Sequence, residues 1–169
     1  TSALGAPAGT TPPGDRPTPT PDDVGAALDA LRTRAPLVHC LTNVVVAQWT
    51  ANLLLALGAA PAMVDNPRES AEFATVADAV LVNLGTPYAE TVAAMERAVA
   101  AASGAGRPWV LDPVAAGAVS WRSGVARRLL TAGAPTILRG NASEVLALDG
   151  GEGGRGVDSV HTPEVAARS

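Results

Sequence analysis

The sequence contains no lysine, and all twelve of its basic residues are arginine. A chain without lysine has no P-loop lysine for nucleotide phosphates, no Schiff-base amine and no lysine general base. If this protein handles phosphates, arginine side chains, backbone N–H groups and a metal ion must meet their charge. The net charge is −4 and no basic run or basic patch with interleaved aromatics is present, so we expect no nucleic-acid partner.

Cysteine and long apolar runs are also scarce. Cys40 is the single cysteine, which excludes an internal disulfide and every zinc site built from several cysteines. The longest apolar stretch, 44–57, is interrupted by Gln48, Thr50 and Asn52, and it falls short of the ~18 apolar residues that a membrane span needs. No signal peptide is visible. We therefore expect a cytoplasmic protein without a membrane partner.

The pattern along the chain predicts an α/β fold. Residues 1–21 are rich in Thr, Pro and Gly and predict a disordered tail, whereas residues 22–169 predict the N-terminal portion of a single domain. Thr20, Pro21 and two aspartates predict a helix that runs to about Arg34. Short apolar runs then alternate with helical segments, which is typical of a mostly parallel sheet with helices on both faces. The expected strands are 37–41, 62–64, 79–84, 109–111 and 136–138, and the expected helices are 44–57, 68–76, 88–103, 122–130 and 141–148.

The segment 134–146 carries the strongest functional signal. An apolar strand is expected to end at Arg139, turn at Gly140 and continue as a helix that carries Asn141 and Glu144. Ligands in open α/β sheets bind outside the carboxyl ends of the strands, where an Arg, an amide and a carboxylate could hold a phosphate and its metal. A capping box is the structural alternative, with Asn141 as the cap and Glu144 three residues later. That alternative does not account for Arg139.

Three other strand ends also carry candidate site residues. The Asn43 amide can donate and accept hydrogen bonds, although capping the next helix explains it equally well. Gly85 would let a ligand approach the backbone, or would simply form a turn. Asp112 is a candidate for holding Mg²⁺ or its waters, with an Asp-Pro turn as the alternative. Asp112 and Glu144 follow successive strands and could face one cleft.

Other residues that attract attention have structural explanations. His39 and Cys40 are neighbours on one expected strand, so they point to opposite faces and cannot form a dyad; we expect each to be buried. Met63 by itself predicts core packing rather than ligand contact. The segment 151–156 matches G-x-G-x-x-G, but it follows a helix and carries an acid where a pyrophosphate would lie. We therefore reject a nicotinamide-dependent Rossmann enzyme.

Six short blocks, in order, resemble the hydroxyethylthiazole kinase family over residues 36–160. They are His39-Cys40-Leu41-Thr42-Asn43, Met63-Val64-Asp65, Asn83-Leu84-Gly85-Thr86, Asp112-Pro113-Val114, Arg139-Gly140-Asn141-Ala142-Ser143-Glu144 and Gly154-Arg155-Gly156-Val157-Asp158-Ser159. The family belongs to the ribokinase-like α/β kinases. The resemblance implies ATP- and Mg²⁺-dependent phosphorylation of 4-methyl-5-(2-hydroxyethyl)thiazole for thiamine biosynthesis or salvage. It also implies a homotrimer with thiazole sites at its subunit interfaces.

The resemblance further implies roles for individual residues. Arg139 would contact the ATP phosphates, with Asn141 beside it. Asp112 and Glu144 would hold Mg²⁺ through its waters. Asn43, Met63 and Gly85 would line the thiazole pocket. For Met63 this implied role replaces the core position that its chemistry alone predicts.

The sequence departs from the family on its C-terminal side. Family members continue beyond the position of Ser169 into a nucleotide-binding threonine and a Gly-Thr-Gly-Cys helix start, which supplies an anion hole. Removing even one such donor costs about 10²–10³ in rate. We therefore expect a ribokinase-like domain that is incomplete at its C-terminal end and nearly inactive alone. Two alternatives remain open: another ribokinase-like kinase of a small alcohol, and a non-catalytic truncated subunit that binds thiazole.

Overall fold

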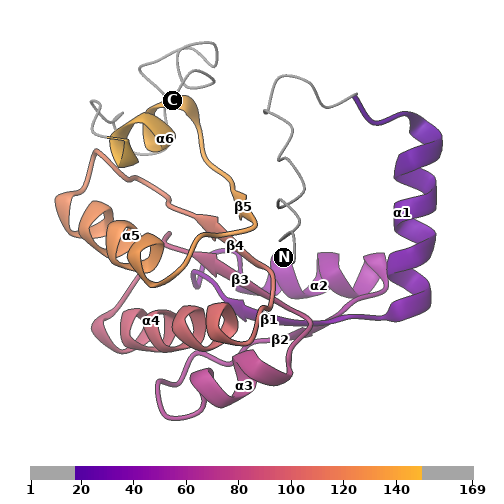
Figure 1. Cartoon of the computed structure of the whole chain (residues 1–169), viewed down its shortest axis with the longest axis horizontal. Helices are drawn as coiled ribbons and strands as arrows, with labels where there is room; N and C mark the ends of the chain where they lie inside the picture. The colour runs from indigo at the N-terminus through magenta and orange to yellow at the C-terminus, as the bar shows by residue number, and fades with distance from the viewer. Residues whose placement is uncertain (1–17, 150–169) are drawn as a thin grey trace, which may run out of the picture.

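The computed structural model describes residues 18–149. Helices and strands alternate along this part of the chain (Figure 1). Their order is α1 (Pro21–Arg34), β1 (Leu37–Leu41), α2 (Ala47–Leu57), β2 (Ala60–Ala62), α3 (Ser70–Val76), β3 (Ala79–Asn83), α4 (Ala89–Gly104), β4 (Trp109–Asp112), α5 (Ser120–Ala132), β5 (Ile137–Leu138) and α6 (Ala142–Leu148). The expected tail before residue 18 and the glycine-rich segment 151–156 lie outside the described residues.

The five strands form one parallel sheet in the order β2-β1-β3-β4-β5, which confirms the predicted α/β class. Strand β2 lies two residues earlier than expected, because its pairing with β1 runs from Leu37↔Ala60 to His39↔Ala62. Strand β1 is followed along the chain by β2 on one side of the sheet, whereas β3 is followed by β4 on the other side. The direction in which the strands are added therefore reverses between the neighbouring strands β1 and β3. Such a switch point is where open α/β sheets bind ligands.

Helix α1 begins where the sequence predicts. Thr20 accepts a hydrogen bond from the Asp23 amide at its Oγ1 (3.2 Å), and the Asp23 carboxylate accepts one from the Thr20 amide (2.8 Å). These bonds from Thr20, first from its hydroxyl and then from its backbone N–H, lower the pKa of Asp23. The reciprocal pair is a capping box, and it fixes the first turn of the helix.

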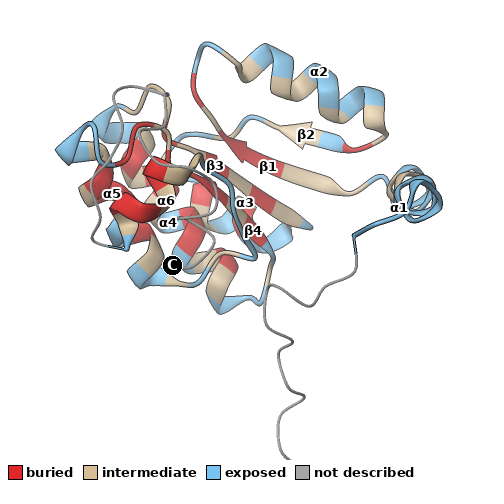
Figure 2. Ribbon diagram, turned by 90° about the horizontal axis from the view of Figure 1, so that it is seen from above, coloured by how far each residue is buried: buried red, intermediate tan, exposed pale blue. Residues whose placement is uncertain are grey.

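The two faces of the sheet are covered unequally (Figure 2). Helices α3, α4 and α5 lie on one face, and their buried side chains pack on strand residues such as Val80, Val82 and Leu111. Helix α2 lies on the opposite face, and none of its residues is buried. Trp49 on that helix is 78% exposed. The described core therefore lies between the sheet and α3–α5.

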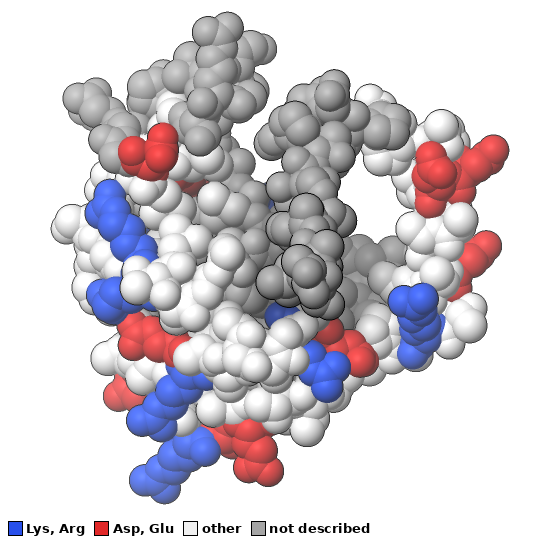
Figure 3. Space-filling view, in the orientation of Figure 1, with Lys and Arg blue, Asp and Glu red and all other residues white. Residues whose placement is uncertain are grey.

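No helix within residues 18–149 has the length and apolarity needed to cross a membrane. On the face drawn in Figure 3, the described basic and acidic side chains are interspersed between uncharged areas. Both signs occur over the same helices, so this face carries no broad field of one sign.

Candidate active site at the carboxyl ends of the strands

Four polar side chains form a continuous chain of hydrogen bonds across the ends of β1, β3, β4 and β5. Asn43 Nδ2 donates to Asn83 Oδ1 (2.6 Å), and Asn83 Nδ2 donates to Asp112 Oδ2 (2.9 Å). Arg139 Nη1 donates to the same Asp112 oxygen (2.5 Å). Asn83 and Asp112 are register partners on adjacent strands, which explains why their side chains meet. This series of hydrogen bonds begins at Asn43, at the β1/β3 switch point.

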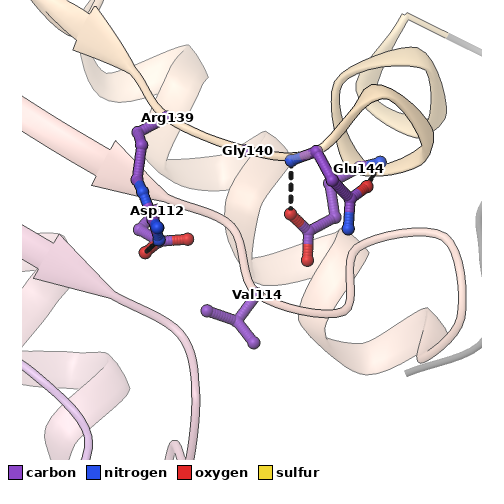
Figure 4. A pocket seen from close by; sticks show the side chains of 6 residues that line it. Asp112, Val114, Arg139, Gly140 and Glu144 are labelled. Atoms are coloured by element: carbon purple, nitrogen blue, oxygen red, sulfur yellow. Dashed lines mark hydrogen bonds and ion pairs between the residues drawn. The ribbon is translucent and has the colours of Figure 1, made fainter. Parts of the chain in front are cut away.

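Asp112 and Arg139 form an ion pair between a buried and an exposed group. The Asp112 side chain is 8% exposed, whereas the Arg139 side chain is 75% exposed. Arg139 projects from the end of β5 toward Asp112 (Figure 4). A guanidinium carries five N–H donors, so Arg139 keeps donors available for a second anion.

Asn141 and Glu144 form the capping box that the sequence offered as the structural alternative. Asn141 Oδ1 accepts from the Glu144 amide (2.9 Å), and Glu144 Oε2 accepts from the Asn141 amide (3.0 Å). Glu144 Oε1 also accepts from the Ala115 amide (2.8 Å), where the backbone is left-handed at φ 63°. Two backbone N–H groups, those of Asn141 and Ala115, therefore fix the buried Glu144 carboxylate, which still lines the cleft.

Two hollows meet at Asp112. The first, of about 460 Å³, is lined by Asp112, Val114, Arg139, Gly140, Asn141 and Glu144. The second, of about 530 Å³, opens beside α2 and is lined by Thr42, Asn43, Val46, Thr50, Leu53, Leu54, Leu81, Asn83, Asp112, Val114 and Arg139. Asp112, Val114 and Arg139 line both. A carboxylate at such a junction can contact groups that enter from either side.

The first hollow suits a hydrated divalent cation. Asp112 and Glu144 both line it (Figure 4), and Mg²⁺ characteristically takes one or two carboxylates together with waters and phosphate oxygens. Within residues 18–149, no group of three or more His, Cys, Asp or Glu side chains is placed to hold a metal. The donor set therefore fits a water-rich Mg²⁺ site rather than a cage of protein ligands.

Gly85 lies directly against Asn43. A Cβ atom built on Gly85 would come within 2.4 Å of Asn43 Nδ2 and 2.8 Å of Asn43 Cβ. The Gly85 amide also donates to Asn83 Oδ1 (2.9 Å). Glycine at this position therefore leaves the room that the Asn43 side chain occupies.

Met63 lies just beyond the edge strand β2 and lines neither of the two hollows. Its exposed fraction is 41%, so the core position that its chemistry alone predicted is wrong. The reason is topological, because Met63 follows β2, which is the edge strand of the sheet.

His39 and Cys40 are both buried, as expected. His39 Nε2 donates to the Val64 carbonyl (2.6 Å), and the ring meets Phe73 edge-on at 5.1 Å. Burial lowers the pKa of His39, although the bond to Val64 opposes that change. Burial raises the pKa of Cys40 to about 11. Neither side chain is presented for catalysis.

Sequence reasoning assigned no role to Asn83, although it is the central member of the hydrogen-bonded chain. Asn83 lies two residues before Gly85, near the carboxyl end of an expected strand. The available signal was a polar residue at such a strand end. Recognising Asn43 as its partner required the strand order, because β1 and β3 are neighbours in the sheet but are not consecutive along the chain.

Comparison with known proteins identifies the family. The hydroxyethylthiazole kinase family model matches residues 28–168. The chain belongs to the hydroxyethylthiazole kinase family. It is 57% identical over 152 residues to a hydroxyethylthiazole kinase of Clavibacter sepedonicus, covering 89% of this chain and 54% of that protein. A relative named likewise from Corynebacterium efficiens is 58% identical over 137 residues, which cover 80% of this chain and 50% of the relative.

A solved member of the hydroxyethylthiazole kinase family has the same fold. The structure of hydroxyethylthiazole kinase protein from Pyrococcus horikoshii superimposes with a TM-score of 0.71 at 44% sequence identity. The match covers 74% of this chain and 49% of that chain. The chain thus spans about half the length of the relatives it matches, and its ribokinase-like fold class is that of the family.

Proposed function

We propose that this chain takes part in the ATP- and Mg²⁺-dependent phosphorylation of 4-methyl-5-(2-hydroxyethyl)thiazole, for thiamine biosynthesis or salvage. The observation that carries the proposal is the position of Asp112 at the junction of two hollows. One hollow has the groups to bind phosphate and metal, and the other is bordered by two side-chain amides, Asn43 and Asn83, and by apolar side chains. Residues 22–169 would be the N-terminal portion of a single kinase domain.

The first hollow would bind the nucleotide phosphates. Arg139 would donate to phosphate oxygens with the donors that its pairing with Asp112 leaves available, and Asn141 would lie beside it. Asp112 and Glu144 would hold Mg²⁺ through its waters, and the metal when bound would neutralise phosphate charge. This arrangement needs no lysine, in agreement with the composition.

The second hollow would bind the alcohol. Asn43 lines it at the end of β1, and Gly85 leaves space for the Asn43 side chain. Met63 would complete the thiazole pocket. The proposed homotrimer, with thiazole sites at subunit interfaces, would account for the exposure of Met63 in the single chain.

Phosphoryl transfer depends mainly on positioning and charge stabilisation. In the proposed reaction, Asn43 and its neighbours orient the hydroxyl, while Arg139 holds the phosphates close to it. Asp112 touches both hollows, so small shifts of its carboxylate change the alignment of the two substrates. A misplacement of about 1 Å can cost about 10²-fold in rate.

The test is product formation from a panel of alcohols with MgATP. The 169-residue chain is assayed beside a chimera in which the remaining half of the Clavibacter sepedonicus relative continues it in register. We expect phosphorylated thiazole from the chimera and little or none from the chain alone. If the chimera phosphorylates a sugar or a pyrimidine alcohol in preference to the thiazole, the proposed substrate is wrong and the preferred alcohol takes its place. Thiazole binding without turnover by the chimera would instead favour a non-catalytic binding subunit.

A further inference from the structure

Asn83 connects the two halves of the candidate site, yet the proposed function assigns it no task. Its amide lies between Asn43, which borders the second hollow, and Asp112, which borders both. It also receives a hydrogen bond from the Gly85 amide. Two acceptor bonds and one donor bond account for most of what a side-chain amide can make.

Backbone donors determine which way both amides point. Asn43 Oδ1 accepts from the Val45 and Val46 amides (3.0 and 3.1 Å), so the Asn43 nitrogen must face Asn83. The Gly85 amide can only donate, so the Asn83 atom that it meets must be the oxygen. Asn83 therefore presents its nitrogen to Asp112. The donor-to-acceptor direction of these hydrogen bonds therefore follows from three backbone N–H groups, and it does not depend on how the amide oxygen and nitrogen atoms were assigned.

The result at Asp112 is asymmetric. Asn83 Nδ2 and Arg139 Nη1 both donate to Oδ2. Two donors on one oxygen fix the rotation of the carboxylate.

We propose that Asn83 is a positioning residue: it locks the Asp112 carboxylate and ties its orientation to that of Asn43 at the alcohol-binding hollow. This inference rests on the proposed kinase function for its kinetic consequence. The hydrogen-bonded linkage itself can be measured without turnover.

Two substitutions separate the tasks of the Asn83 amide. Asn83→Asp keeps an oxygen for Asn43 and Gly85 but replaces the donor to Asp112 with a second carboxylate. Asn83→Leu keeps the number and branching of the side-chain heavy atoms, although it is bulkier, and removes every side-chain hydrogen bond. Asn52→Asp, at an exposed position of α2, is the matched control for added charge.

In the chimera, we expect Asn83→Asp to lower kcat by about 10- to 100-fold while the thiazole KM stays within about threefold. Asn83→Leu should lower kcat similarly and raise the thiazole KM, because Asn43 loses its partner. Asn52→Asp should leave both unchanged. A kcat for Asn83→Asp within twofold of the parent would overturn the inference.

The linkage has its own readout in the 169-residue chain. We expect Asp112→Asn to shift the NMR signals of both the Asn83 and the Asn43 side-chain amides, and we expect the Asn43 shift to vanish in an Asn83→Leu background. An Asn43 side-chain amide signal whose chemical shift does not change in Asp112→Asn would refute the linkage. If the parent chimera makes no product while these shifts appear, the proposed function fails and the positioning role of Asn83 stands.

Discussion

Substituting alanine for Gly85 should displace the Asn43 side chain. The new Cβ would come within 2.4 Å of Asn43 Nδ2, 2.6 Å of its Cγ and 2.8 Å of its Cβ. The residues of positive φ in the described part do not include Gly85, so alanine fits the backbone there and the conflict is purely steric. Because the clash reaches Asn43 Cβ, a rotation of the terminal amide alone cannot relieve it.

The expected cost follows from the bonds that Asn43 would lose. Its side chain makes three hydrogen bonds, with Val45, Val46 and Asn83. Each is worth about 0.5–1.5 kcal/mol net, so we expect the free energy of unfolding to fall by about 2–4 kcal/mol. The same displacement should weaken thiazole binding in the chimera.

Urea denaturation followed by circular dichroism measures this loss. Gly25→Ala is the matched control, because nothing lies within 4 Å of a Cβ at this helical position and alanine there should stabilise slightly. In an Asn43→Gly background, Gly85→Ala should cost almost nothing, since the clashing side chain is gone. A loss below about 0.5 kcal/mol in the parent background, or an equal loss in both backgrounds, would refute the steric argument.

Three further outcomes are expected of the 169-residue chain. Burial lowers the pKa of His39 below its ordinary 6.5, so as the pH falls the imidazole is protonated in the unfolded chain before it is protonated in the folded chain. The free energy of unfolding should therefore fall as the pH drops below about 6.5. Urea titrations should show a slope of at most about 1.4 kcal/mol per pH unit that His39→Gln removes. A pKa of about 11 leaves Cys40 almost wholly as the thiol at pH 8, so a disulfide reagent should react rapidly only after unfolding. Glu96→Gln breaks an exposed ion pair with Arg128 (2.7 Å) and should change stability by less than about 1 kcal/mol.

Local patterns predicted most of the fold. Apolar runs bounded by turns marked the strands, and the Thr20 and Asn141 capping signals lie where helices begin. Helix α2 begins three residues later than expected, because Asn43 Oδ1 first takes the Val45 and Val46 amides in a turn. Such an effect depends on one side chain rather than on periodicity.

The candidate site was predictable where it depends on consecutive strands. Asp112 ends β4 and Arg139 directly follows β5. These two strands are adjacent both along the chain and in the sheet, so the contact between the two side chains could be expected. Asn83 and Asn43 meet only because β1 pairs with β3. Met63 was misjudged from its own chemistry, since exposure at a sheet edge depends on the strand order. The roles of these residues in binding stay predictions.

The most direct test of the central claim, that Asp112 organises phosphoryl transfer between two hollows, compares Asp112→Asn with Asp29→Asn in the chimera. Asp29 is exposed on α1 and supplies the matched loss of one charge. Formation of thiazole phosphate from MgATP is measured at saturating substrates. The account predicts that Asp112→Asn lowers kcat by about 10²-fold or more while Asp29→Asn stays within twofold. Equal rates for the two variants would contradict it.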